Sequence, residues 1–190
     1  AEMKKVFLLV LLPLFSWGQE SFNFEDTVKL KYTFSILVED LKKHLLVLAS
    51  DSLEGRETGE QGQKKAAEYI ANCFKKAGIP PYKCNTYYQK FKVKSKGHLC
   101  QKIILKQKNI KGENVLGFIE GTDLKDEVII ITAHYDHLGK NESSIYNGAD
   151  DNASGTSAIL EIAEAFMKAK KDSVGPRRSI LIMAVSGEEK

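Results

Sequence analysis

Three short runs of this chain carry side chains that bind metal ions. The first is His134-Tyr135-Asp136, the second contains Asp150 and Asp151, and the third contains Glu188 and Glu189. A histidine and several carboxylates, drawn from separate segments, are the ligands from which proteins build hydrolytic zinc sites. The residue types therefore predict a metal-dependent hydrolytic centre.

Each of the three runs lies where a secondary-structure element is expected to begin or end. The apolar stretch at 127–133 is typical of a strand buried on both faces, and 178–186 predicts a second buried strand. A helix is expected between them, from 153 to about 171. A strand, a helix and a strand in this order predict two parallel strands. Ligands in α/β sheets bind at the carboxyl ends of the strands, so we expect the runs to converge there.

The spacing within the first run suggests roles for its residues. His134 and Asp136 are two positions apart in an extended segment, so both side chains point the same way. A carboxylate beside a metal-binding imidazole fixes its tautomer and raises its basicity. We therefore predict His134 as a metal ligand and Asp136 as the residue that orients it. His137 leaves a second possibility open, a ligand pair formed by His134 and His137.

The two acidic pairs share one logic. Neighbouring residues point in different directions, so one member of each pair is expected to face the metal. One aspartate of Asp150 and Asp151 can bind, and even bridge two cations, while the other caps the helix. One glutamate of Glu188 and Glu189 can bind, while the other accepts a proton from metal-bound water.

Further elements follow from periodicity and from turn residues. A helix capped by Ser35 is expected to run to about Ala49, with His44 at the rim of the core. A polar loop, a second helix and short strands are expected at 51–59, 60–77, 82–93, 101–107 and 114–120. Gly78 should end the second helix, because Pro80 and Pro81 forbid its continuation. The alternating lysines at 90–96 predict a solvated strand face that protects a sheet edge.

Length and composition limit the function classes. The 190 residues suffice for one domain with a core, and a net charge of +3 is too small to argue for nucleic acid as a partner. Three cysteines, Cys73, Cys84 and Cys100, allow at most one internal disulfide, and we read them as structural.

The N-terminus is typical of a signal peptide. Met3-Lys4-Lys5 is basic, 6–15 is apolar, and Ser16-Trp17-Gly18 is a small-x-small cleavage site. Residues 1–18, two of them ahead of Met3, are therefore predicted to be removed, leaving 19–190. The apolar run is too short for a stable membrane anchor. An exported protein, periplasmic or secreted, is expected.

Several of these runs resemble the co-catalytic di-zinc aminopeptidase family, which includes glutamate carboxypeptidase-like and glutaminyl cyclase-like relatives. The similar segments are 114–117, 133–139, 148–155 and 187–189, and 48–56 looks like the N-terminal region of that family. The resemblance implies an α/β fold, with three α/β/α layers around a mixed, centrally parallel sheet. It makes 19–190 the N-terminal part of a zinc peptidase catalytic domain.

The resemblance also implies a role for each site residue. His134 matches a ligand of one zinc ion, Glu189 a ligand of the other, and Asp151 the carboxylate that bridges both. Glu188 matches the general base and Asp136 the acid that orients the histidine, while Asp150 matches no ligand. The implied cofactors are two Zn²⁺ ions, and the implied substrates are peptides with a free N-terminus.

This sequence departs from the family pattern at its end. The family takes a further aspartate and a further histidine from segments beyond its Glu-Glu motif, and here only Lys190 follows. The resemblance thus implies a fragment that binds metal weakly and is inactive. Three other readings stay open: a single-zinc glutaminyl cyclase, a non-catalytic ectodomain of the same fold, and an iron oxygenase using His134 and Asp136. The expected helix at 153–171 speaks against the oxygenase, whose scaffold is all-β.

Overall fold

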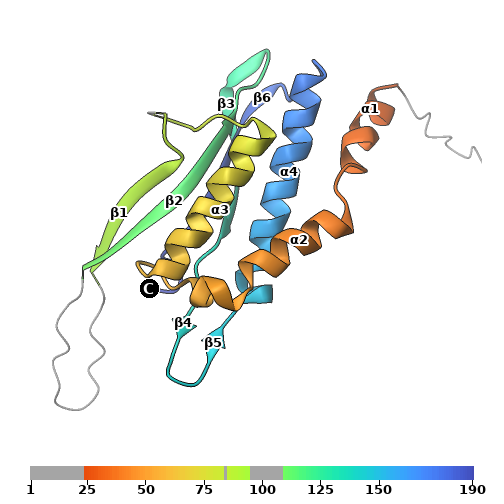
Figure 1. Cartoon of the computed structure of the whole chain (residues 1–190). Coiled ribbons are helices and arrows are strands. Elements are labelled where there is room, and N and C mark those ends of the chain that lie inside the picture. The colour runs from red at the N-terminus through yellow and green to blue at the C-terminus, as the bar shows by residue number, and fades with distance from the viewer. Residues whose placement is uncertain (1–23, 84, 95–108) are drawn as a thin grey trace, which may run out of the picture.

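The computed structural model describes residues 24–83, 85–94 and 109–190 (Figure 1). Its helices are α1 (Phe24–Thr33), α2 (Val38–Leu48), α3 (Gln61–Ala77) and α4 (Ser154–Lys171), with the short helical segments η1 (Asp51–Arg56) and η2 (Ala149–Ala153). Its strands are β1 (Tyr88–Lys94), β2 (Asn109–Ile119), β3 (Leu124–His134), β4 (Gly139–Lys140), β5 (Ile145–Tyr146) and β6 (Arg178–Val185).

Four strands form the main sheet in the order β1-β2-β6-β3. The strand β2 is antiparallel to both β1 and β6, whereas β3 and β6 are parallel. Helix α4 makes the connection between the two parallel strands, as the apolar runs and the helix between them predict. The α/β class with a mixed sheet is therefore confirmed.

Helices α3 and α4 lie on the same side of the sheet in Figure 1, and their apolar residues form the core with it. In α3 the buried residues Ala66, Ala67, Ile70 and Phe74 recur at helical spacing. They meet strand residues of β2 and β6 such as Val115, Ile119, Ile180 and Ile182. Each fully buried large apolar side chain contributes about 1.5–3 kcal/mol, so this contact fixes the helices over the sheet. The three-layer arrangement stays a prediction.

The ends of the helices were predicted with mixed success. Helix α3 ends before Gly78, which has a φ of 81° and donates its N–H to the Lys75 carbonyl, while the N–H of Ile79 donates to the Phe74 carbonyl, as expected for this kind of helix end. The predicted cap at Ser35 is wrong, because α2 begins at Val38. The Ser35 hydroxyl instead donates to the Tyr32 carbonyl at the end of α1, a helix that the periodicity did not reveal.

The burial of β3 on both faces is a prediction that the structure contradicts. Val128, Ile129 and Ile130 are 49%, 46% and 57% exposed. The physical reason is position: β3 is the last strand of the sheet within the described residues, and it pairs there only with β6. Strand β6, enclosed between β2 and β3, is buried as predicted.

The opposite edge of the sheet is β1, where Lys90 and Lys92 are exposed as expected for a protected edge. Cys73 is a free thiol. The predicted strand at 101–107, the signal peptide, Cys84 and Cys100 lie outside the described residues. Among the helices that the structure describes, none has the length and apolar character needed to cross a membrane.

Candidate metal centre

The three motif segments meet at the carboxyl ends of strands β3 and β6. His134 is the last residue of β3 and pairs in register with Val185, the last residue of β6. Glu188 and Glu189 follow β6 directly, and Asp151 lies in η2, immediately before α4. The convergence that the strand-end placement predicted is therefore present in the fold.

Asp151 lies between two histidines and presents one oxygen to each. Its Oδ1 is 3.0 Å from His134 Nε2, and its Oδ2 is 4.0 Å from His137 Nδ1. Glu189 adds Oε1 at 3.3 Å from the same His137 nitrogen. The Asp151 side chain is 63% exposed, so its two oxygens remain accessible from solvent.

The tightest cluster of possible ligand atoms joins His137, Asp151 and Glu189, whose atoms all lie within 4.8 Å of one another. His137 thus belongs to the cluster, although the spacing to Asp136 favoured His134 as the metal ligand and left a His134–His137 ligand pair as an alternative. The ring of His137 packs closely against Gly148, where an added Cβ would stand 2.5 Å from its Cγ. That close approach, which a sequence does not reveal, aims the ring at Asp151.

Asp136 is fully buried behind His134. Its Oδ2 accepts hydrogen bonds from the Thr58 hydroxyl at 2.6 Å and from the Gly187 N–H at 2.8 Å. Its Oδ1 has no hydrogen-bond partner and lies 3.7 Å from His134 Nδ1. The hydrogen-bond partner of His134 Nδ1 is instead the backbone carbonyl of Asp136, at 3.3 Å, and Nε2 of His134 faces Asp151.

Arg56 is a charged residue of the site region that the sequence reasoning missed. Its guanidinium is fully buried and donates to the backbone carbonyls of Tyr135 at 2.7 Å, Asn147 at 2.7 Å and Gly148 at 2.9 Å, and to that of Leu48. Burial lowers the pKa of Arg56 to about 10, and the charges of Asp136 and Asp151 oppose that effect. The guanidinium therefore stays protonated at neutral pH.

Tyr135 anchors the strand end between the two functional residues of its run. Its ring is fully buried, and its hydroxyl donates to the Glu113 carbonyl at 2.6 Å and accepts from the Gln63 amide. Burial raises the pKa of Tyr135, so the phenol remains neutral. The Tyr135 ring is part of the hydrophobic core and has no predicted role in metal binding.

The remaining acidic residues of the motifs face solvent. Glu188 and Asp150 are both exposed, and the Asp150 carbonyl accepts a hydrogen bond from Ser154. An exposed carboxylate beside a metal cluster is open to water and to substrate. The roles of the individual site residues stay predictions.

The side chains at the carboxyl ends of β3 and β6 fit a zinc ion. Within the cluster one buried polar atom, His137 Nδ1, lacks a hydrogen-bond partner, which is costly unless another group satisfies it. The close approach of His137 Nδ1 to Glu189 lacks hydrogen-bond geometry, although a cation between them would satisfy both. Imidazole nitrogens with carboxylate oxygens are the donor set that zinc prefers in hydrolytic sites.

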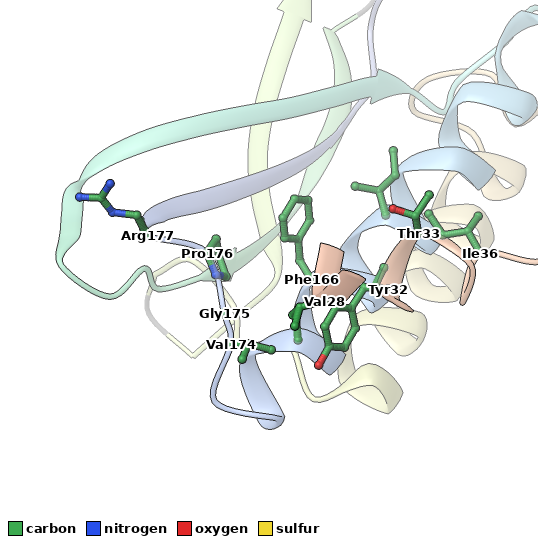
Figure 2. Close-up of a pocket in the computed structure, with 12 residues that line it drawn as sticks. Val28, Tyr32, Thr33, Ile36, Phe166, Val174, Gly175, Pro176 and Arg177 are labelled. Atoms are coloured by element: carbon green, nitrogen blue, oxygen red, sulfur yellow. The ribbon is translucent and has the colours of Figure 1, made fainter. Parts of the chain in front are cut away.

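A large cavity of about 730 Å³ lies elsewhere, between α1, the second half of α4 and the loop before β6 (Figure 2). Its lining is mostly apolar and includes Val28, Tyr32, Phe166 and Val174. Helix α4 begins beside the carboxyl ends of β3 and β6, so its second half lies towards the amino ends of these strands. The cavity is therefore separate from the candidate metal centre.

Comparison with known proteins agrees with this site. Residues 114–190, which carry all three motifs, match the model of peptidase family M28. The family resemblance seen in the motifs is thereby confirmed.

Two curated relatives are similar over less than half of this chain. A probable glutamate carboxypeptidase of Arthroderma benhamiae is 40% identical over 76 residues, which are 40% of this chain and 10% of that protein. A probable zinc metalloprotease of Leptosphaeria maculans is 32% identical over 83 residues, which are 42% of this chain and 18% of that protein. The chain thus spans less than a fifth of the length of these relatives.

Solved structures share the fold over most of the chain. BSAP, a zinc aminopeptidase from Bacillus subtilis, superposes with a TM-score of 0.60 at 15% identity, over 80% of this chain and 62% of that one. The glutaminyl cyclase of Fimbriiglobus ruber gives a TM-score of 0.58 at 15% identity, over 81% and 46% of the two chains. At these identities the likeness establishes the α/β fold that the M28 segment adopts.

Proposed function

We propose that this protein is a zinc-dependent aminopeptidase, which hydrolyses the N-terminal peptide bond of peptides. The observation that carries the proposal is the placement of Asp151, whose two oxygens face two different histidines. A carboxylate between two separate sets of ligands is the arrangement that bridges a pair of metal ions. The match of residues 114–190 to the model of a peptidase family supports the hydrolytic reaction.

The residues would hold two zinc ions on either side of Asp151. His134 serves the Oδ1 side, and Glu189 serves the Oδ2 side, where His137 also points. Bound zinc lowers the pKa of a coordinated water towards neutrality and polarises the carbonyl of the substrate. The ligand oxygens and nitrogens of the chain set where that chemistry takes place.

The other residues orient side chains and move protons. The backbone carbonyl of Asp136 accepts the Nδ1 proton of His134, and the Asp136 carboxylate lies 3.7 Å from the same nitrogen, so that Nε2 carries the lone pair that faces Asp151. The exposed Glu188 carboxylate accepts a proton from the attacking water and returns it to the leaving amine nitrogen. General bases of this kind contribute about 10²–10⁴-fold to a rate.

The charge around the site favours a substrate with a free amino terminus. Asp150 and Glu188 are exposed carboxylates adjacent in sequence to Asp151 and Glu189, and they attract a cationic amine and repel a terminal carboxylate. The name of the structural relative BSAP, a zinc aminopeptidase, supports the same substrate class. The activity of a glutamate carboxypeptidase fits this charge pattern less well.

Metal analysis of paired variants tests the assignment within the Glu-Glu pair. In the full-length protein, Glu188→Ala should reduce turnover of an aminoacyl anilide by at least about 10²-fold while zinc content stays near that of the wild type, because the base is not a ligand. Glu189→Ala should lose zinc as well. Glu142→Ala, which removes another exposed carboxylate, is the control and should change neither quantity. Equal loss of zinc in the Glu188 and Glu189 variants would overturn the assignment.

A second candidate is a single-zinc glutaminyl cyclase, supported by the fold shared with the cyclase of Fimbriiglobus ruber. The two oxygens of Asp151 face two different histidines, which favours hydrolysis with two metal ions instead. Assays on glutaminyl peptides and on aminoacyl anilides, together with zinc content per chain, separate the two activities. One zinc per chain with cyclase activity alone would establish the second candidate.

We further propose that the protein is exported. The basic start, the apolar run at 6–15 and the small residues at 16–18 support a cleaved signal peptide. Mass spectrometry of the mature N-terminus is the test. A chain that begins near Gln19 is expected, and an intact Met3 in the purified protein would contradict export.

A further inference from the structure

The segment around η1 contacts each of the three motif segments, although none of its side chains belongs to the predicted ligand set. Arg56 reaches the end of β3 and the turn before α4 through its guanidinium. Thr58 reaches Asp136 and the turn after β6 through its hydroxyl. A loop that the sequence marks only as polar and glycine-rich thus lies where the three segments meet.

Thr58 connects two of these segments with a single hydroxyl group, which is 2% exposed. Its Oγ1 donates to Asp136 Oδ2 at 2.6 Å and accepts the Gly187 N–H at 3.0 Å. Gly187 also donates to Asp136 Oδ2 at 2.8 Å, which closes a three-membered network. The network sets both the carboxylate behind His134 and the start of the Glu188–Glu189 turn.

Arg56 connects the other pair of segments. Its side chain bonds the carbonyl of Tyr135, the residue between His134 and Asp136, and that of Gly148, three residues before Asp151. Its own carbonyl accepts the His137 N–H at 3.3 Å. The separation between both histidines and Asp151 therefore depends on one buried side chain and its backbone.

We propose that Thr58 and Arg56 are positioning residues of the metal centre, which hold the three motif segments at the separations that metal binding needs. The inference rests on the proposed zinc function of the same cluster. Groups that orient metal ligands matter because coordination tolerates little displacement, and losing one typically weakens metal affinity about 10–100-fold. Neither residue contacts a substrate in this role.

Two matched variants test the proposal without relying on a severe change. Thr58→Val keeps the shape of the side chain and removes its hydroxyl. Ser179→Ala is the control, since Ser179 is fully buried, donates to the Lys125 carbonyl at 2.6 Å and accepts the Gly121 N–H at 3.0 Å. Both variants lose one donated and one accepted hydrogen bond, but Ser179 is the second residue of β6 and lies at the opposite end of that strand from the site.

Two readouts are needed, the zinc dissociation constant and amide hydrogen exchange of the metal-free protein. Thr58→Val should weaken zinc binding about 10-fold or more and speed exchange in the peptide that contains 186–189. Ser179→Ala should leave both unchanged, whatever its effect on thermal stability. Arg56→Lys keeps the charge but not the fork of donors, and should speed exchange at 147–151.

The possible outcomes separate this inference from the proposed function. Wild-type zinc affinity in Thr58→Val, or an equal loss in Thr58→Val and Ser179→Ala, would refute the positioning role. A wild-type protein that binds no zinc would refute the proposed function. In that case unchanged exchange at 186–189 in Thr58→Val would also refute the positioning role, and faster exchange would uphold it.

Discussion

Replacing Gly62 with alanine sets two well-known effects against each other. Gly62 lies in the first turn of α3, where alanine favours the helix by up to about 1 kcal/mol. Helix propensity alone therefore predicts a more stable protein. The packing of α3 against η1 predicts the opposite.

The structure decides the sign. A Cβ built on Gly62 would stand 1.8 Å from the Leu53 carbonyl oxygen and 2.7 Å from the Leu53 carbonyl carbon. Both atoms are backbone, so no side-chain rotation relieves the clash, and η1 must move by more than about 1 Å. Overpacking of this kind costs about 1–3 kcal/mol and sometimes more, which outweighs the gain in propensity. We expect Gly62→Ala to lower the free energy of unfolding by about 1–2 kcal/mol.

Urea denaturation followed by circular dichroism measures this loss, and thermal unfolding should show a melting temperature lower by about 2–8 °C. The control is Gln61→Ala, on the exposed side of the same turn, which should change stability by less than about 0.5 kcal/mol. Because η1 carries Arg56, Gly62→Ala should also weaken zinc binding. A variant as stable as the wild type, with unchanged zinc affinity, would show that α3 does not press on η1 as the structure has it.

Three further results are expected. Gly148→Ala should weaken zinc binding about 10-fold, because the new Cβ would stand 2.5 Å from His137 Cγ and the φ of 52° disfavours alanine; unchanged affinity in a zinc titration would contradict this. Tyr135→Phe should lower the free energy of unfolding by about 1–3 kcal/mol, because the buried Gln63 amide loses its acceptor while the Glu113 carbonyl keeps the Ser186 hydroxyl as a donor, and urea denaturation checks it. Burial raises the pKa of Glu161, which faces His44 and Asp40 of α2, Tyr69 and Cys73 of α3, and Glu164 of its own helix. A carboxyl with a raised folded-state pKa stabilises the fold fully below its ordinary pKa of 4.5, and that stability is lost as pH rises through the folded value. As pH rises from 4.5 through the folded-state pKa of Glu161, the free energy of unfolding should therefore fall more steeply in the wild type than in Glu161→Gln. An identical pH dependence in the two proteins would refute the raised pKa of Glu161.

Periodicity and strand-end placement predicted the elements that carry the site. The apolar run before His134, the helix after Asp151 and the strand before Glu188 were all expected, and each is present within a few residues. The parallel pairing of β3 and β6 followed from the connection through α4. These features are local, or follow from chain connectivity, so a sequence can reveal them.

The errors arose where a neighbouring element decides the outcome. The exposure of Val128 to Ile130 depends on which strands lie beside β3, and an apolar run carries no such information. The Ser35 hydroxyl donates its hydrogen bond to the Tyr32 carbonyl at the end of α1, so Ser35 does not cap α2. In both cases the residue types fit the expectation and the surroundings do not.

The sequence by itself predicted which side chains can bind a metal and that they gather at the carboxyl ends of two parallel strands. Only the tertiary structure decided that His137 turns towards Asp151 and Glu189, and that Arg56 and Thr58 connect the three segments. The reason is physical. Ligand types and strand ends are encoded within short stretches, whereas the direction of a ring and the partners of a buried charge depend on contacts between residues far apart in the chain.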